Sequence, residues 1–272
     1  MKVREALAVA AERLRPVSDT PRLDAELLAA HALGTSRETM LLSHLDDPAP
    51  AAIADLLSRR LAHEPVAYIT GTREFWTVTL DVTPDVLIPR ADSETLIEAA
   101  IDHFGAGPGP RSILDLGTGS GALLLAALDH WPQARGIGLD ESQAAVRVAR
   151  ANVRKLGLRA RARIGHGGWL GHGGPHDLIL CNPPYVETGS TLSREVADWE
   201  PASALFAGPD GMDDYLMIAP VLYPQLAPGG VACIEIGYTQ AAGASALFAD
   251  AGFIVKVRRD LAGRDRCLVL RH

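Results

Sequence analysis

Apolar residues recur at helical spacing through the first part of the chain. In residues 2–15 they stand three or four positions apart, at Val3, Leu7, Ala10 and Leu14. A second helix is predicted over 20–34, because a capping threonine is followed by proline and the segment closes on glycine. A third is predicted over roughly 51–63, ending before Pro65. We therefore expect residues 1–72 to form a small helical domain. Since it carries no catalytic constellation, its expected role is substrate recognition.

The spacing then changes to that of strands. Phe75-Trp-Thr-Val-Thr-Leu-Asp-Val alternates, which predicts a β-hairpin linker over 73–90. From Arg111 onward, short apolar runs alternate with helical segments, so residues 91–272 should form an α/β domain with a mainly parallel, doubly wound sheet. The predicted strands are Ser112–Leu116, Gly136–Asp140, Ala160–Ile164, Asp177–Asn182, Val231–Ile236, Phe253–Arg258 and Arg266–Leu270.

Composition and charge narrow the functional classes. With 47% apolar and 22% charged residues, the 272-residue chain is an ordinary globular protein. Its net charge of -7 argues against a surface that binds phosphate backbones, so we do not expect nucleic acid as a partner. One segment is locally basic, and we interpret it as the solvated face of a helix and its exit. Its cations are Arg147, Arg150, Arg154, Lys155, Arg159, Arg161 and Arg163.

The sequence also predicts the cellular compartment of the protein. Glu5 interrupts the position where a signal peptide needs an apolar run, and no stretch of 18 apolar residues predicts a membrane helix. Cys181, Cys233 and Cys267 are scattered within strand-like runs and lack metal-ligand spacing. We expect reduced core thiols in a cytoplasmic protein without a membrane partner.

A glycine-rich turn predicts a nucleoside site. The run Ile113-Leu-Asp-Leu-Gly-Thr-Gly-Ser-Gly leads from a buried strand into a helix, with Thr118 and Ser120 between glycines 117, 119 and 121. Such glycines let the backbone turn sharply and approach a ligand closely. Asp140 ends the next strand, where its carboxylate can accept hydrogen bonds from both ribose hydroxyls.

Two other interpretations of this turn remain open. Gly117, Gly119 and Ala122 also satisfy the permissive dinucleotide fingerprint, and a plain strand-to-helix turn needs no ligand. Asp115 and the Gly-x-Gly-x-Gly spacing are more typical of class I methyltransferases, which bind S-adenosylmethionine. That cofactor has no pyrophosphate, so the third-glycine rule of dinucleotide sites is not required.

The candidate chemical site follows another strand. Asp177-Leu-Ile-Leu-Cys delivers the tetrad Asn182, Pro183, Pro184 and Tyr185 to the same sheet edge as the glycine turn. An isolated Asn-Pro would be no more than a turn. Here the tetrad suits a planar –NH2 group, whose two donors need two acceptors. The Asn182 carboxamide oxygen and the Pro183 carbonyl can supply them, and the prolines add no competing N–H. Tyr185 can stack on the planar group, so catalysis would be mainly positioning.

Two features of the following loop have alternatives. His166, His172 and His176 match no rigid metal-ligand pattern, so we expect a flexible loop and no metal. Trp169 can stack on an adenine ring or simply pack at the rim of the sheet.

With these residues in view, the chain resembles the bacterial peptide chain release factor glutamine methyltransferase family nearly end to end. The tetrad alone is shared with adenine-N6 DNA methyltransferases, whereas the Ile-Pro-Arg segment and the Glu-Pro and Asp-Gly blocks are more specific. The matching pieces are Asp24-Ala-Glu-Leu-Leu, Glu64-Pro-Val-Ala-Tyr-Ile-Thr-Gly, Leu87-Ile-Pro-Arg-Ala-Asp-Ser-Glu, the glycine turn, the tetrad, Glu200-Pro-Ala-Ser-Ala-Leu, Asp210-Gly, Glu235-Ile-Gly and Asp260-Leu-Ala-Gly-Arg-Asp-Arg.

The resemblance implies a class I, Rossmann-like methyltransferase domain behind a helical bundle and a hairpin. It implies methylation of the glutamine in the Gly-Gly-Gln motif of class 1 release factors by a monomeric enzyme, with S-adenosyl-L-homocysteine as product. By position, the cofactor would contact Gly117, Thr118, Gly119, Ser120, Gly121, Asp140, Trp169 and Asn182. The tetrad, Asn182 to Tyr185, would bind the glutamine and carry the catalysis.

The chain departs from the family at two positions. Ala91 replaces a common proline. Gly168 stands where the family usually has Asp, so we expect one polar contact to the adenosine to be missing, and Gly168→Asp to tighten cofactor binding. Two rival functions remain: a nucleic-acid adenine-N6 methyltransferase, and a binding module that keeps the fold without catalysis.

Overall fold

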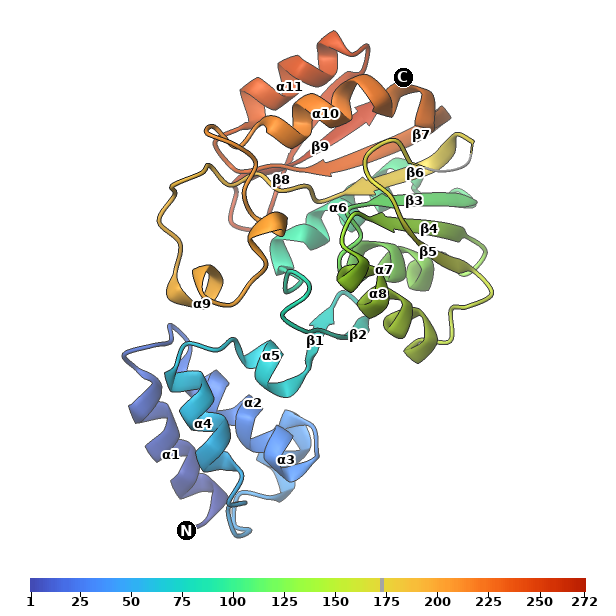
Figure 1. Ribbon diagram of the computed structural model, residues 1–272. Helices are drawn as coiled ribbons and strands as arrows, with labels where there is room; N and C mark the ends of the chain where they lie inside the picture. Colours follow the sequence, from blue (N-terminus) through green and yellow to red (C-terminus); the bar gives the residue numbers. More distant parts are fainter. Residues whose placement is uncertain (172–173) are drawn as a thin grey trace. The chain divides into compact units, whose positions relative to one another are not determined.

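The structure is a computed structural model that describes residues 1–171 and 174–272. The chain forms two compact units (Figure 1). The helical unit comprises Met1–Thr72 together with Leu192–Glu200, and the sheet unit comprises Arg73–Thr191 together with Pro201–His272. Within the described residues, no helix is both long and apolar enough to cross a membrane.

The helical unit contains the three helices predicted by spacing and three short helices, α3, α5 and α9, that the spacing did not predict. The short helix α3 begins after Ser36, whose hydroxyl accepts the Thr39 N–H at 3.1 Å. Gly34 ends α2 in the left-handed conformation at φ 66°, as a C-terminal glycine is expected to do. The elements are α1 (Val3–Leu14), α2 (Pro21–Leu33), α3 (Arg37–Ser43), α4 (Ile53–Leu61), α5 (Val66–Thr70) and α9 (Arg194–Ala197).

A buried arginine fastens the distant segment to this unit. Arg60 is 3% exposed, and its Nε donates to Asp24 Oδ2 at 2.7 Å. Its Nη2 donates to Glu195 Oε2 at 2.8 Å, and both carboxylates therefore offset the buried charge. The surrounding core is built from apolar side chains of α1 to α4, including Val3, Leu7, Leu14, Met40 and Leu57.

The sheet unit is α/β, as predicted. Its seven-stranded sheet has the order β5-β4-β3-β6-β7-β9-β8, and β9 runs antiparallel to both its neighbours. Sheet strands are β3 (Ser112–Leu116), β4 (Arg135–Asp140), β5 (Ala162–His166), β6 (His176–Cys181), β7 (Leu226–Glu235), β8 (Ile254–Arg259) and β9 (Asp265–Arg271). A separate two-stranded hairpin is formed by β1 (Thr72–Phe75) and β2 (Val78–Asp81), and it begins one residue before the predicted linker.

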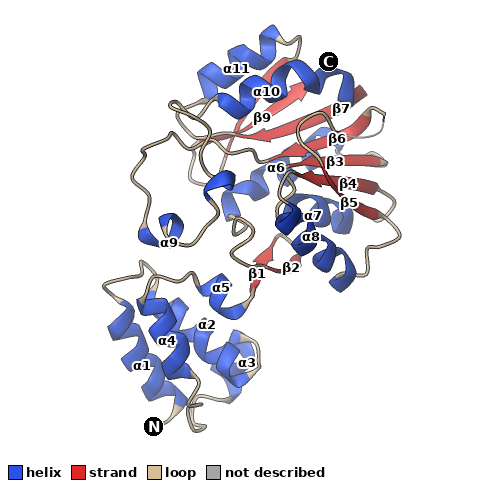
Figure 2. Cartoon of the chain, in the orientation of Figure 1, coloured by secondary structure: helices blue, strands red, loops and turns tan. Residues whose placement is uncertain are grey.

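Helices cover both faces of the sheet (Figure 2). Leucines and alanines of α6, α7 and α8 pack on one face, and α10 and α11 pack on the other with Tyr215 and Phe248. The helices are α6 (Glu94–Phe104), α7 (Ala122–His130), α8 (Gln143–Lys155), α10 (Asp213–Leu222) and α11 (Ala241–Asp250), with single turns η1 (Ala91–Ser93), η2 (Ala202–Ala204) and η3 (Tyr223–Gln225).

Strand register brings the predicted site together. Leu116, the last residue of β3, pairs with Leu139 of β4 and with Cys181 of β6. All three strands are parallel, so the residues that follow them emerge side by side at one edge. The glycine turn, Asp140 and the tetrad therefore meet there.

Candidate active site

A cavity of about 510 Å³ opens at this carboxyl edge of the sheet. Eight of the residues predicted for the site line it: Gly117, Thr118, Gly119, Ser120, Asp140, Trp169, Asn182 and Pro184. Gly121, Pro183 and Tyr185 are not among its described lining residues. The lining also includes residues that sequence reasoning did not place there, among them Phe75, Val86, Ser93, Glu141 and Asp214.

The glycines of the turn adopt the left-handed conformation that the sequence pattern predicts. Gly117, Gly119 and Gly121 have φ values of 69°, 55° and 88°. A Cβ on Gly117 would lie 3.3 Å from the Trp169 ring, so that position also needs its small size. The turn thus brings backbone, indole and the start of the tetrad into contact.

Asp140 is fixed by two backbone donors. Its Oδ2 accepts the Gly119 N–H and its Oδ1 accepts the Ser142 N–H, each at 2.8 Å. Burial raises the pKa of Asp140, while these two hydrogen bonds oppose the shift. Each oxygen keeps a lone pair for a ligand, so the carboxylate is oriented to accept two hydroxyl donors.

A second carboxyl lies beneath the turn. Asp115 is 1% exposed and accepts the Thr118 hydroxyl at 2.5 Å. Burial raises the pKa of Asp115 to about 7. Its role is to hold the turn from below, since it does not line the cavity.

Two carboxylates, Asp214 and Glu141, line the cavity together with Trp169. The indole Nε1 donates to Asp214 Oδ1 at 3.2 Å, and the ring also packs on the core of the α10 face. A Cβ on Gly168 would lie 2.5 Å from Glu141 Oε1. Glu141 Oε1 therefore occupies the space that a side chain at residue 168 would enter, a contact that no sequence pattern indicates.

Asn182 is held through its amide nitrogen. Its Nδ2 donates to Ser93 Oγ at 3.2 Å, and Ser93 is 4% exposed. Ser93 belongs to the Ile-Pro-Arg segment, which the resemblance marked without indicating a contact. With its nitrogen engaged, Asn182 presents its oxygen as an acceptor.

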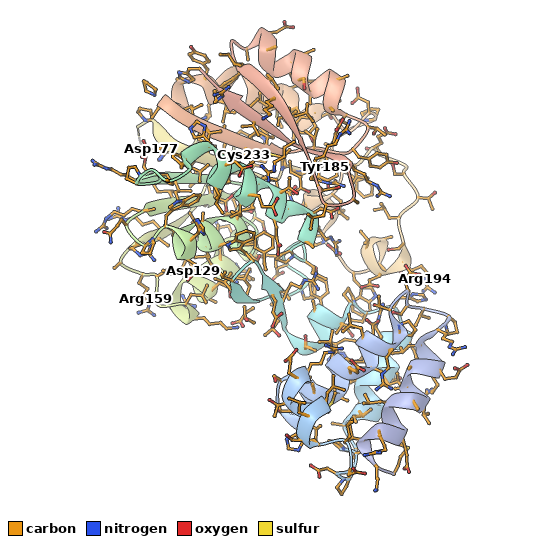
Figure 3. All side chains as sticks on the ribbon, turned by 180° about the vertical axis from the view of Figure 1, so that it is seen from behind. Asp129, Arg159, Asp177, Tyr185, Arg194 and Cys233 are labelled. Carbon is orange, nitrogen blue, oxygen red and sulfur yellow. The ribbon has the colours of Figure 1, made fainter. Side chains whose placement is uncertain are left out.

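Tyr185 is held by hydrogen bonds at its side-chain hydroxyl and at its backbone carbonyl. Its hydroxyl donates to Glu235 Oε1 at 3.1 Å, and its carbonyl accepts Gln240 Nε2 at 3.0 Å. Gly211 passes so close that a Cβ there would lie 2.3 Å from the Tyr185 carbonyl oxygen. Figure 3 shows Tyr185 and Asp177 toward opposite ends of the sheet. The Asp-Gly and Glu-Ile-Gly blocks thus support the tetrad.

Among residues 1–171 and 174–272, no group of three or more His, Cys, Asp or Glu side chains is arranged to hold an ion. His172 of the expected histidine loop lies outside the described residues.

The fold and the site are those of a Rossmann-like methyltransferase. The family model for the methyltransferase small domain matches residues 92–198, and the model for the PrmC N-terminal domain matches residues 5–71. A methyltransferase structure from Pyrococcus furiosus shares the fold at a TM-score of 0.54 and 16% identity, covering 80% of this chain and 98% of that one.

Two relatives that match this chain over most of their own length show its family. A release factor glutamine methyltransferase of Rhodospirillum rubrum is 44% identical over 93% of this chain and 79% of its own length. Another, from Caulobacter vibrioides, is 39% identical over 97% of this chain and 94% of its own. The chain belongs to the release factor glutamine methyltransferase family, which confirms the expected resemblance and fold class.

Proposed function

We propose that this chain methylates the side-chain amide nitrogen of the glutamine in the Gly-Gly-Gln motif of a class 1 peptide chain release factor. S-adenosylmethionine supplies an electrophilic methyl group on its sulfonium sulfur and leaves as S-adenosylhomocysteine. One observation carries the proposal: Asn182 lines the same cavity as the glycine turn and Asp140. Because its amide nitrogen is bonded to Ser93, its side-chain oxygen is left to accept a hydrogen bond.

The residues present suit that cofactor. The cavity volume of about 510 Å³ is in the range of nucleoside-sized ligand sites. Asp140 can accept from the ribose hydroxyls, and Trp169 offers an aromatic face for the base. The carboxylates Asp140, Glu141 and Asp214 suit a ligand that carries a positive charge.

The tetrad supplies orientation more than acid–base chemistry. An amide nitrogen is a poor nucleophile, because its lone pair is delocalised into the carbonyl. Asn182 lines the cavity, and its Oδ1 would accept one N–H of the amide. The Pro183 carbonyl is the proposed acceptor of the other, although Pro183 is not among the described lining residues, and the two bonds would aim the nitrogen. The nitrogen gains the methyl group, and its surplus proton leaves to solvent afterwards. Positioning of this kind accounts for much of the expected rate gain.

The helical unit is the proposed recognition module for the remainder of the release factor. We expect a monomeric, cytoplasmic enzyme, in keeping with three buried, unpaired cysteines. The basic segment around α8 gives little support to nucleic acid, since several of its cations are engaged internally. Arg150 donates to the Ile164 carbonyl, Arg161 to the Leu128 carbonyl and Lys155 to Asp81.

One labelling experiment separates the candidate functions. The purified chain is incubated with methyl-labelled S-adenosylmethionine and, separately, a class 1 release factor, the same factor with alanine in place of the motif glutamine, or duplex DNA. We expect label only in the unaltered release factor. Label in the DNA would establish the adenine methyltransferase instead, and no label with bound cofactor would leave a binding module.

A further inference from the structure

The indole ring of Trp169 is fixed by contacts at its nitrogen, its backbone and its outer edge. Its Nε1 donates to Asp214 Oδ1 at 3.2 Å, and its backbone carbonyl accepts a hydrogen bond from Gln225 Nε2 at 3.0 Å. The edge of the ring farthest from the nitrogen lies beside the glycine turn, because a Cβ on Gly117 would be 3.3 Å from Trp169 Cη2. The ring therefore lies between the turn and the Asp214 carboxylate.

Asp214 reaches Trp169 from another element. It belongs to the first turn of α10, where a carboxylate is favoured by the helix dipole, and it lines the cavity. Its neighbour Asp213 is exposed and is not among the described lining residues. An indole has a single N–H donor, so a bond from that donor to a fixed acceptor selects one orientation of the ring, which apolar packing alone does not.

We propose that Asp214 is a positioning residue for the cofactor, because it holds the Trp169 ring in the orientation that receives the adenine base. The inference rests on the proposed function, in which Trp169 offers an aromatic face to that base. Aromatic rings attract one another in offset-stacked or edge-to-face arrangements, so the angle of the indole sets its contact with a planar base. Asp214 acts on the base through Trp169 and need not touch it.

A direct electrostatic role for the same carboxylate makes different predictions. Asp214 lines the cavity and could attract the sulfonium charge of S-adenosylmethionine without any help from Trp169. S-adenosylhomocysteine keeps the adenosine and the amino-acid group but lacks that charge. Loss of a residue that acts through the indole weakens the binding of both ligands equally, whereas loss of an attracting charge weakens mainly S-adenosylmethionine.

We expect Asp214→Ala to weaken the binding of both ligands about tenfold, the scale of one hydrogen bond to a charged group. Asp214→Asn should bind nearly as the wild type does, because its carboxamide oxygen can still accept the indole N–H. Trp169→Phe keeps an aromatic ring but has no N–H, so adding Asp214→Ala to it should cause no further loss. Asp213→Ala is the matched control: it removes a carboxylate from the same helical turn and should keep wild-type affinity.

Calorimetry measures Kd for both ligands with every variant, and thermal unfolding monitors the fold. Without ligand, the indole N–H resonance that disappears in Trp169→Phe should shift in Asp214→Ala and stay in place in Asp213→Ala. Wild-type affinity of Asp214→Ala, a loss confined to S-adenosylmethionine, or an undiminished loss in the Trp169→Phe background would overturn the positioning role.

Two further outcomes are separated from these. If Asp214→Ala fails to fold, Asp214→Leu takes its place, since leucine is similar in shape to aspartate and has no acceptor. If the wild type binds neither ligand, the proposed function is refuted, and an unshifted resonance in the ligand-free Asp214→Ala protein would separately remove the contact with Trp169.

Discussion

At the scale of single residues, Asp140, the proposed acceptor for the ribose hydroxyls, is held in one orientation by the protein itself. Because backbone N–H groups of Gly119 and Ser142 hold both carboxylate oxygens, folding has already met the cost of ordering the side chain. We expect Asp140→Ala to weaken S-adenosylmethionine binding by about 1–3 kcal/mol, the loss of charged hydrogen bonds. Calorimetry checks this against Asp177→Asn, at the opposite end of the sheet, which should keep wild-type affinity. Equal affinity for both variants would remove Asp140 from the site.

The position of Glu141 changes what we expect of an aspartate at residue 168. Since Glu141 Oε1 lies where a side chain at 168 would begin, Gly168→Asp should place two like charges together and bring no tighter binding. In a Glu141→Ala background the space is free, and there Gly168→Asp should tighten cofactor binding. Calorimetry on the four proteins tests this. Tighter binding in the otherwise wild-type chain would show that the loop makes room.

Asn182 carries the sharpest chemical prediction. Asn182→Ala removes an acceptor for the substrate amide, and misplacing a reacting atom by about 1 Å can cost on the order of 10²-fold in rate. Asn182→Asp keeps an acceptor but cannot donate to Ser93, so it should be badly impaired too. Both variants should still fold, because the residue lies at a strand end and not in the core. Near-normal turnover by both would contradict the acceptor-pair mechanism.

Site residues that belong to a short sequence motif could be predicted from the sequence. Contacts between residues far apart in the sequence could not. Glycine spacing exposes the turn, and a carboxylate at a strand end exposes Asp140. Ser93 and Asn182 are separated by 89 positions, and Tyr185 and Glu235 by 50. No period or motif rule links such distant residues. Their contacts form only when η1 folds against the end of β6 and when β7 pairs with β6.

At the scale of elements, the structure confirms the predicted strands but shifts some of their first and last residues. The structure ends β6 at Cys181, one residue before the predicted limit, and begins β5 at Ala162 and not at Ala160. A backbone turn explains the second shift, since the Arg161 N–H is bonded to the Leu158 carbonyl. Apolar runs predict that a strand exists, while competing turn hydrogen bonds decide where it starts.

The loop that carries Gly211 should be intolerant of any side chain. Gly211 has φ +71°, and an added Cβ would lie 2.3 Å from the Tyr185 carbonyl oxygen. We expect Gly211→Ala to displace the tetrad and lower methyl transfer by about 10²-fold. Gly34→Ala is the control, since Gly34 has φ +66° with nothing within 4 Å. Both changes place an L-side chain in the left-handed region, at a cost of about 1–2 kcal/mol. A difference between the two variants in unfolding and in rate therefore measures the clash with Tyr185. Equal behaviour of the two variants would show that the tetrad does not depend on Gly211.

At the scale of the whole molecule, buried carboxyls link stability to pH. The pKa of Asp115 is raised from 3.8 to about 7, so between these values the folded protein holds a proton that the unfolded chain has lost. Raising the pH across that window therefore favours unfolding. Relative to Asp115→Asn, the wild type should lose up to about 1.4 kcal/mol of stability per pH unit, levelling off above the upper pKa. Urea unfolding of both proteins from pH 5 to 8 measures the difference, and parallel curves would contradict it.

The helical unit is discontinuous in the sequence, which limits how this protein can be recombined. The chain leaves or enters that unit after residues 72, 191 and 200, because Leu192–Glu200 returns to it. Arg60 contributes to this return through its bond to Glu195. A chimera that exchanges only the first 72 residues with a relative would separate a co-adapted pair and leave a buried guanidinium short of a partner. Exchange of the helical unit between relatives should therefore succeed as a two-segment graft, in which Leu192–Glu200 is transferred together with Met1–Thr72.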